Sequence, residues 1–239
     1  MVIKYIIFRA VKFPIKQLVC CLLLSGVVII LLWCGNLDDR VFPAQTVLPL
    51  SGRIICVDPG HGGYDPGTIR NGIQEKDIVL KIAVCLQDYL QQGGAWVVLT
   101  REEDRDFLEV TAGPKKRLDM KHRRQIIEEG GGELLISIHA NCISSTIWRG
   151  AQVFYREGSE EGKLLASAIQ NELIRILQNT DRQAKSSDYY ILRETSMPGV
   201  IVEVGFLSNP EEAELLNRPE YQKKIAWAIY LGIISYLCQ

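Results

Sequence analysis

Two of the three histidines in this 239-residue chain stand where they could bind a metal. His61 lies in DPGHGG (residues 58–63), directly after an apolar run, and its glycine neighbours let the backbone and the ring approach a ligand closely. His139 follows another apolar run, in SIHAN (137–141), and Glu75 opens a predicted helix in QEKD (74–77). Two histidines and one carboxylate are a ligand set of catalytic zinc, which keeps a fourth position open for water.

Other interpretations of these residues are simpler. A glycine-rich turn after a strand can hold phosphate, but neither the P-loop ending nor the dinucleotide fingerprint is present. A single histidine after a strand is usually a loop residue, and Glu75 could be an acid favoured by the helix dipole. His61 and His139, however, follow predicted parallel strands, and open α/β sheets place their sites at that edge. His122, in KHRR (121–124), is expected at the surface.

Glu203 is a carboxylate within an apolar run, PGVIVEVGF (198–206). An unpaired buried carboxylate costs several kcal/mol, so it should have a partner or a function. A salt bridge to a core arginine is one explanation. The better one is a general base beside a metal site, because the attacking water must lose a proton.

Strands and helices alternate along the chain. Apolar runs predict strands at 54–57, 95–100, 134–138, 151–155, 189–192 and 200–204. Helical periodicity predicts helices over 75–91, from 115 to the glycines at 130–132, over 160–178 and over 219–237. This order predicts a three-layer α/β/α sandwich with a mostly parallel central sheet of about six strands.

The N-terminus carries an export or anchoring pattern. Residues 18–33 (LVCCLLLSGVVIILLW) hold no charge; four bases precede them, and Asp38 and Asp39 follow. This asymmetry predicts a cytoplasmic N-terminus and an external body. No small-residue cleavage site follows closely, which favours an uncleaved signal-anchor over a cleaved signal peptide. We therefore expect a signal-anchor or transmembrane segment at 1–36, a linker at 37–52 and a catalytic domain at 53–239.

Charge and cysteine content narrow the function classes. Without residues 1–17 the chain holds 23 bases against 28 acids, an unfavourable balance for nucleic-acid binding. The seven cysteines include no C-x-x-C, so neither a disulfide framework nor a cysteine zinc site is expected.

Four motifs occur together: VDPGHGG, a glutamate fourteen residues after the histidine, SIHAN and VEVGFLSN. In this combination the chain resembles the zinc-dependent N-acetylmuramoyl-L-alanine amidases of bacterial cell walls, over roughly residues 53–237. The resemblance implies His61, Glu75 and His139 as zinc ligands and Glu203 as the catalytic base. None of these four positions departs from the family pattern.

The resemblance also implies a reaction, a setting and partners. The reaction is hydrolysis of the amide between the muramic acid lactyl group and L-alanine of peptidoglycan. Within the family, the chain is most similar to the sporulation and germination branch that prepares spore-cortex peptidoglycan for muramic lactam formation. Candidate partners are a deacetylase acting on the product and an activating lipoprotein. The expected location is extracytoplasmic, membrane-anchored or secreted, including the intermembrane space of the developing spore.

Three alternatives remain open: a stem-peptide carboxypeptidase with a similar zinc site, a vegetative wall amidase, and a wall-binding scaffold with an inactive site. Asn141, Arg101 and the loop at 141–149 are candidate substrate contacts.

Overall fold

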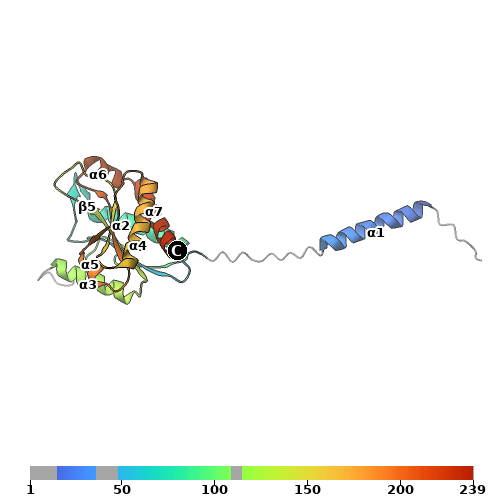
Figure 1. Cartoon of the computed structure of the whole chain (residues 1–239), viewed down its shortest axis with the longest axis horizontal. Coiled ribbons are helices and arrows are strands. Elements are labelled where there is room, and N and C mark those ends of the chain that lie inside the picture. The colour runs from blue at the N-terminus through green and yellow to red at the C-terminus, as the bar shows by residue number, and fades with distance from the viewer. Residues whose placement is uncertain (1–14, 36–47, 109–114, 239) are drawn as a thin grey trace, which may run out of the picture. The chain divides into compact units, whose positions relative to one another are not determined.

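The computed structural model describes residues 15–35, 48–108 and 115–238, and the chain forms two units, Met1–Thr46 and Val47–Gln239 (Figure 1). The first unit contains one described helix, α1 (Ile15–Gly35). Among the described parts of the chain, no helix meets the length and hydropathy needed to cross a membrane. Most of the predicted linker at 37–52 lies outside the described residues.

The second unit is built on a six-stranded sheet in the order β4-β1-β5-β8-β6-β7. Its strands are β1 (Ile54–Pro59), β4 (Trp96–Leu99), β5 (Leu134–Asn141), β6 (Gln152–Arg156), β7 (Lys185–Ser187) and β8 (Gly199–Phe206). All neighbouring strands run parallel except β6 and β8. A small hairpin, β2 (Ile69–Arg70) and β3 (Ile73–Gln74), leads into the first helix of this unit.

Helices cover both faces of the sheet (Figure 1). They are α2 (Glu75–Gln92), α3 (Lys115–Glu129), α4 (Glu160–Leu177), α5 (Tyr190–Glu194), α6 (Pro210–Leu216) and α7 (Pro219–Leu237). Side chains alternate along each strand, so Ile55 and Val57 of β1 join the core with α2, α4 and α7. Cys56 faces the other way, into a smaller core with α3 and α5. The three-layer α/β/α prediction is therefore confirmed.

One predicted strand is wrong. Residues 189–192 do not join the sheet, because Tyr190–Glu194 form the short helix α5, and β7 lies earlier, at Lys185–Ser187. Ile191 and Leu192 of this helix are both buried, and the Thr195 hydroxyl donates to the Ile191 carbonyl at 2.7 Å. A short apolar run carries no periodicity that separates a strand from a buried helical turn.

Candidate active site

Three adjacent strands, β1, β5 and β8, bring the predicted site residues to one edge of the sheet. β1 ends at Pro59, which lies opposite Ile138 of β5, so His61 and His139 follow neighbouring strand positions. Across the next pairing, His139 lies opposite Glu203 of β8. Paired residues point to the same face, so these two side chains share the face covered by α3 and α5.

The three predicted ligands converge. Glu75 Oε1 lies 3.1 Å from His61 Nε2 and 3.1 Å from His139 Nδ1. One donor atom from each of these residues can be chosen so that all lie within 4.8 Å of one another. Nitrogen and carboxylate oxygen donors at this spacing fit a zinc ion. His122 lies apart on α3, where its Nδ1 is 3.0 Å from the Leu118 carbonyl oxygen.

The outer atoms of the ligands are also held. Asp65 Oδ2 lies 2.9 Å from His61 Nδ1, the ring nitrogen other than the one that faces Glu75, and carboxylates at this position commonly orient a metal-bound histidine. The second oxygen of Glu75 accepts from the Thr68 amide at 2.9 Å, and Oε1 accepts from the Ala140 amide at 3.0 Å. Asp65 was not predicted from the sequence, although its position four residues after His61 in the same turn was an available signal.

The backbone at Gly60 and His61 is constrained by its conformation and by close contact with β5. His61 itself adopts a positive φ of 59°, which is costly for a residue other than glycine. A Cβ on Gly60 would overlap the His139 ring, so only glycine allows β5 to approach this closely.

Two buried arginines hold the carbonyl groups of this loop. Arg101 donates to the Pro59 carbonyl at 3.0 Å and to the Gly60 carbonyl at 2.8 Å. Arg123 donates to the Pro59 carbonyl at 2.8 Å and also to the His61 carbonyl. Arg101 is 1% exposed, so it supports the loop rather than contacting substrate as the sequence suggested.

Asp58 anchors Arg123 beneath the loop. It accepts from Arg123 at 2.9 Å, from the Thr100 hydroxyl at 2.7 Å and from the Ser137 hydroxyl at 2.8 Å. Burial alone would raise the pKa of Asp58, but the charge of Arg123 and the two hydroxyl donors lower it to about 2. The carboxylate is thus charged at neutral pH.

Glu203 meets a different environment. It is 8% exposed, and its Oε2 has no hydrogen-bond partner among the described residues. Burial raises the pKa of Glu203 to about 7. Tyr189 lines the same cavity, and burial together with the Glu203 charge raises the pKa of its hydroxyl to about 12.

These residues line a cavity of about 340 Å³. The cavity brings together His61, His139 and Glu203, along with Asp65, Tyr189 and Lys116, which the sequence analysis had not singled out. An adjoining hollow is lined by Glu75, Asn141 and Cys142, so Asn141 keeps its place as a candidate substrate contact. A donor set for one metal and an isolated carboxylate, at the strand ends of an α/β/α sandwich, define an α/β metallohydrolase.

The family follows from sequence comparison. The profile described as N-acetylmuramoyl-L-alanine amidase matches residues 55–235, and the chain belongs to this family. The germination-specific N-acetylmuramoyl-L-alanine amidase of Bacillus subtilis (strain 168) is 47% identical over 196 residues, covering 80% of this chain and 83% of that protein.

Solved structures agree with this assignment. The CwlD amidase from Clostridioides difficile, in complex with the GerS lipoprotein, matches with a TM-score of 0.76 and 38% identity, over 78% of this chain and 98% of that chain. The amidase AmiC2 of Nostoc punctiforme matches with a TM-score of 0.70 and 33% identity, over 79% and 99%. The family, fold and enzyme class predicted from the motifs are confirmed.

Proposed function

We propose that His61, Glu75 and His139 hold one zinc ion, with which the chain hydrolyses the amide between the muramic acid lactyl group and L-alanine. The convergence of these three side chains on one point is the observation that carries the proposal. The amidase family is shown by the sequence match, and the donor chemistry fits zinc.

Each residue of the site has a distinct role in this proposal. His61 and His139 supply neutral nitrogen donors, and Glu75 supplies a carboxylate that two backbone amides orient. When bound, zinc supplies Lewis-acid polarisation of the amide carbonyl and lowers the pKa of a water towards ~7. Asp65 orients the His61 ring from its far side.

Glu203 is the proposed general base. Glu203 lines the cavity, its Oε2 has no hydrogen-bond partner among the described residues, and it lies opposite His139 on the neighbouring strand. These observations support a role beside the proposed ligands rather than among them. In the reaction, Glu203 takes the proton of the attacking water and delivers it to the departing nitrogen of L-alanine. The products are a muramoyl carboxylate and a peptide with a free amine.

The proposal is tested by identifying the chain ends that cleavage creates. Purified protein is incubated with muropeptides in a buffer that contains zinc, and the products are identified by mass. The amidase leaves an intact stem peptide that begins with free L-alanine. Release of single residues from the far end of the stem peptide, with the lactyl amide intact, would instead support a carboxypeptidase. No change in any bond would support the wall-binding scaffold.

A role in spore-cortex maturation is the finer part of the proposal. The similarity to the germination-specific amidase of Bacillus subtilis supports it. The similar amidase solved with the GerS lipoprotein supports an activating lipoprotein as the partner class, and a deacetylase would act on the product. Cortex from a deletion strain should lack muramic lactam, and the wild-type gene should restore it. Normal lactam content in the deletion strain would instead favour a vegetative wall amidase.

We propose further that residues 1–36 direct the body out of the cytoplasm as a signal-anchor, with a linker at 37–52 and the catalytic domain at 53–239. The charge asymmetry around residues 18–33 supports this topology. The body would then meet peptidoglycan on the outer face of a membrane.

A further inference from the structure

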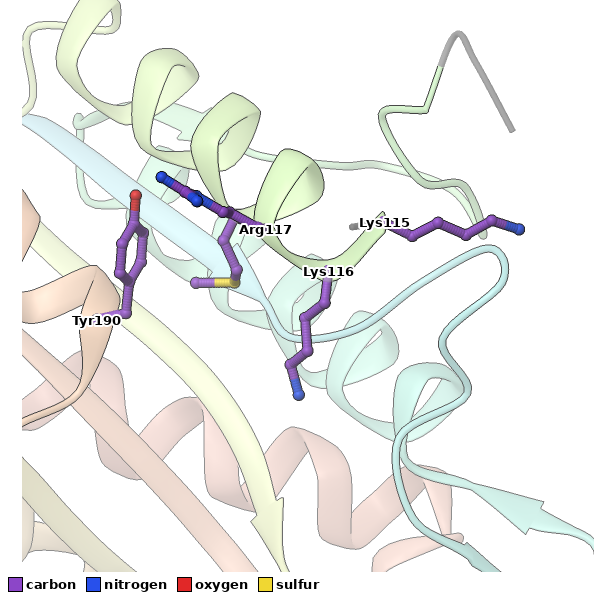
Figure 2. A pocket seen from close by; sticks show the side chains of 5 residues that line it. Lys115, Lys116, Arg117 and Tyr190 are labelled. Carbon is purple, nitrogen blue, oxygen red and sulfur yellow. The ribbon is translucent and has the colours of Figure 1, made fainter. Parts of the chain in front are cut away.

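A second cavity adjoins the catalytic pocket at the start of α3 (Figure 2). It has a volume of about 660 Å³ and is lined by Lys115, Lys116, Arg117, Met120 and Tyr190. Lys116, Met120 and Tyr190 also line the catalytic pocket, so the two hollows share a wall. A ligand extending from the reacting centre along this wall would pass the start of α3, where Lys116 and Arg117 lie.

The catalytic pocket itself is rich in acids. Its walls include four carboxylates and two cations, which are Asp58, Asp65, Asp119, Glu203, Lys116 and Arg123. Arg123 is paired with Asp58 at 2.9 Å and with Asp119 at 2.8 Å. Of the two cations, only Lys116 has no ion pair within the described part of the chain. An acidic substrate would be repelled here unless a nearby group compensated its charge.

The bases at the start of α3 provide that compensation. Lys116 and Arg117 are exposed, and neither lies within ion-pair distance of a described carboxylate. In Figure 2 Arg117 extends toward the side of the cavity where Tyr190 lies, whereas Lys115 extends the opposite way. Lys115 instead lies over the Tyr64 ring, 5.6 Å from its centroid. Among the described residues that line this cavity, Lys116 and Arg117 are therefore the cations available to a ligand.

We propose that Lys116 and Arg117 bind the free carboxylate of the residue after L-alanine in the stem peptide, on the leaving-group side of the scissile amide. This inference rests on the proposed amidase function. The lactyl carboxylate of muramic acid is consumed in the amide, so the free carboxylates of the substrate lie in its peptide. Lys116 reaches the catalytic pocket itself, and the Arg117 guanidinium offers a planar fork that suits a carboxylate. Met120 and Tyr190 supply an apolar wall for the aliphatic part of the peptide.

The test compares two synthetic muramoyl peptides that differ only in whether the residue after L-alanine carries a free carboxylate or a carboxamide. The full-length protein in detergent is assayed as wild type, as the double variant Lys116→Gln/Arg117→Gln, and as Lys121→Gln. Lys121 is an exposed base of the same helix that lines neither cavity. Lys121→Gln therefore controls for the loss of one positive charge from this helix outside the proposed subsite. Zinc content is measured in every sample.

The double variant should raise KM for the carboxylate substrate about tenfold, the scale expected for losing a charged hydrogen bond at a partly solvated site. Its kcat, its zinc content and its cleavage of the carboxamide substrate should stay within about twofold, because the removed groups do not touch the reacting atoms. Lys121→Gln should match wild type on both substrates. Equal losses on both substrates, or no loss on either, would overturn the subsite.

A binding measurement separates this inference from the amidase proposal. Calorimetric titration with the free acidic stem peptide requires no catalysis, and the double variant should bind it about tenfold more weakly than wild type. If wild type cleaved neither substrate but bound the peptide through these bases, the amidase proposal would fail and the anion subsite would stand. If wild type cleaved the amide but wild type and the double variant bound the peptide equally well, the amidase proposal would stand and the anion subsite would fail.

Discussion

Glu75 and Glu203 are two carboxylates at one edge of the sheet that meet opposite surroundings. Burial would raise the pKa of Glu75, but hydrogen bonds from the two imidazoles lower it well below its usual range. Glu203 accepts no hydrogen bond from an imidazole, and burial raises its pKa to about 7. Environments that move the pKa values of two carboxylates apart suit different chemical roles, and they support the proposed roles of Glu75 as a ligand and Glu203 as a base.

Glu203→Gln should fold normally, keep its zinc and lose amide cleavage by roughly 10²–10⁴-fold, because the amide preserves shape but cannot accept the proton of water. Bound zinc and cleavage are measured on the same sample. Glu75→Gln is the matched comparison, and it should lose zinc as well as activity. Loss of zinc in Glu203→Gln would make that residue a ligand, and near-normal cleavage would make its role structural.

His61→Ala and His139→Ala should each lose both zinc and activity, since each removes one of the three proposed ligands. His122→Ala provides the control, because this third histidine lies apart on α3 and should keep both. Asp65→Asn should retain the fold but weaken zinc binding by about 10–100-fold, the usual effect of removing a group that orients a ligand. Full zinc content in either ligand variant would contradict the assignment.

Among the elements, α3 contributes the arginine that joins the sheet to the loop that carries His61. Arg123→Gln would leave the buried charge of Asp58 without its partner, so the free energy of unfolding should fall by about 3–5 kcal/mol. Urea denaturation measures this change, with Lys121→Gln on the exposed side of the same helix as control. A loss below about 1 kcal/mol would show that Arg123 serves the loop alone.

Asp58 should also make the domain sensitive to acid. Its pKa is about 2 when folded and ordinarily 3.8, so the unfolded chain binds the proton more readily. The stabilisation is fully present above about pH 4 and is lost as pH falls towards 2, amounting to roughly 2 kcal/mol. Unfolding free energies measured between pH 2 and 5 test this. In Asp58→Asn this part of the pH dependence should disappear, and an unchanged slope would contradict it.

The helices and strands also show which parts of the fold could be predicted from the sequence. Long helices such as Glu160–Leu177 and strands such as Leu134–Asn141 carry clear periodicity or apolar runs, and they were predicted within a few residues. The antiparallel direction of β6 and the helical turn at 190–194 depend on tertiary packing. Arg101 and Arg123 could not be predicted as loop supports, since their partners lie some 40 to 65 residues earlier in the chain.

Of the site, the motifs predicted His61, Glu75, His139 and Glu203, and the structure brings them to one edge of the sheet. Each lies next to a strong local signal, either glycine neighbours, a helix start or a strand end. Asp65 carries only a weak signal, its place four residues after His61, and Lys116 carries none, because an acid in a turn and a lysine in a helix have many other uses. Their proximity to the site exists only once the strands and α3 are packed.

For the whole molecule, the charge asymmetry around residues 18–33 predicts an external catalytic unit. A reporter fused after residue 45 should be active only if it is one that works outside the cytoplasm. A reporter restricted to the cytoplasm should be silent at the same position. Activity of the second reporter would overturn the orientation, and moving the four N-terminal bases to the other side of the apolar run should reverse both results.

The arginine contacts to the carbonyls of residues 59–61 have a consequence for metal uptake. Because Arg101 and Arg123 hold this backbone through protein contacts alone, little conformational entropy remains to be lost when zinc arrives. The metal-free protein should therefore keep its near-ultraviolet circular dichroism after chelation, unlike zinc fingers, which unfold without metal. Added zinc should then raise Tm only by mass action on a preorganised site. Collapse of the dichroism on chelation would show that the loop is ordered by the metal.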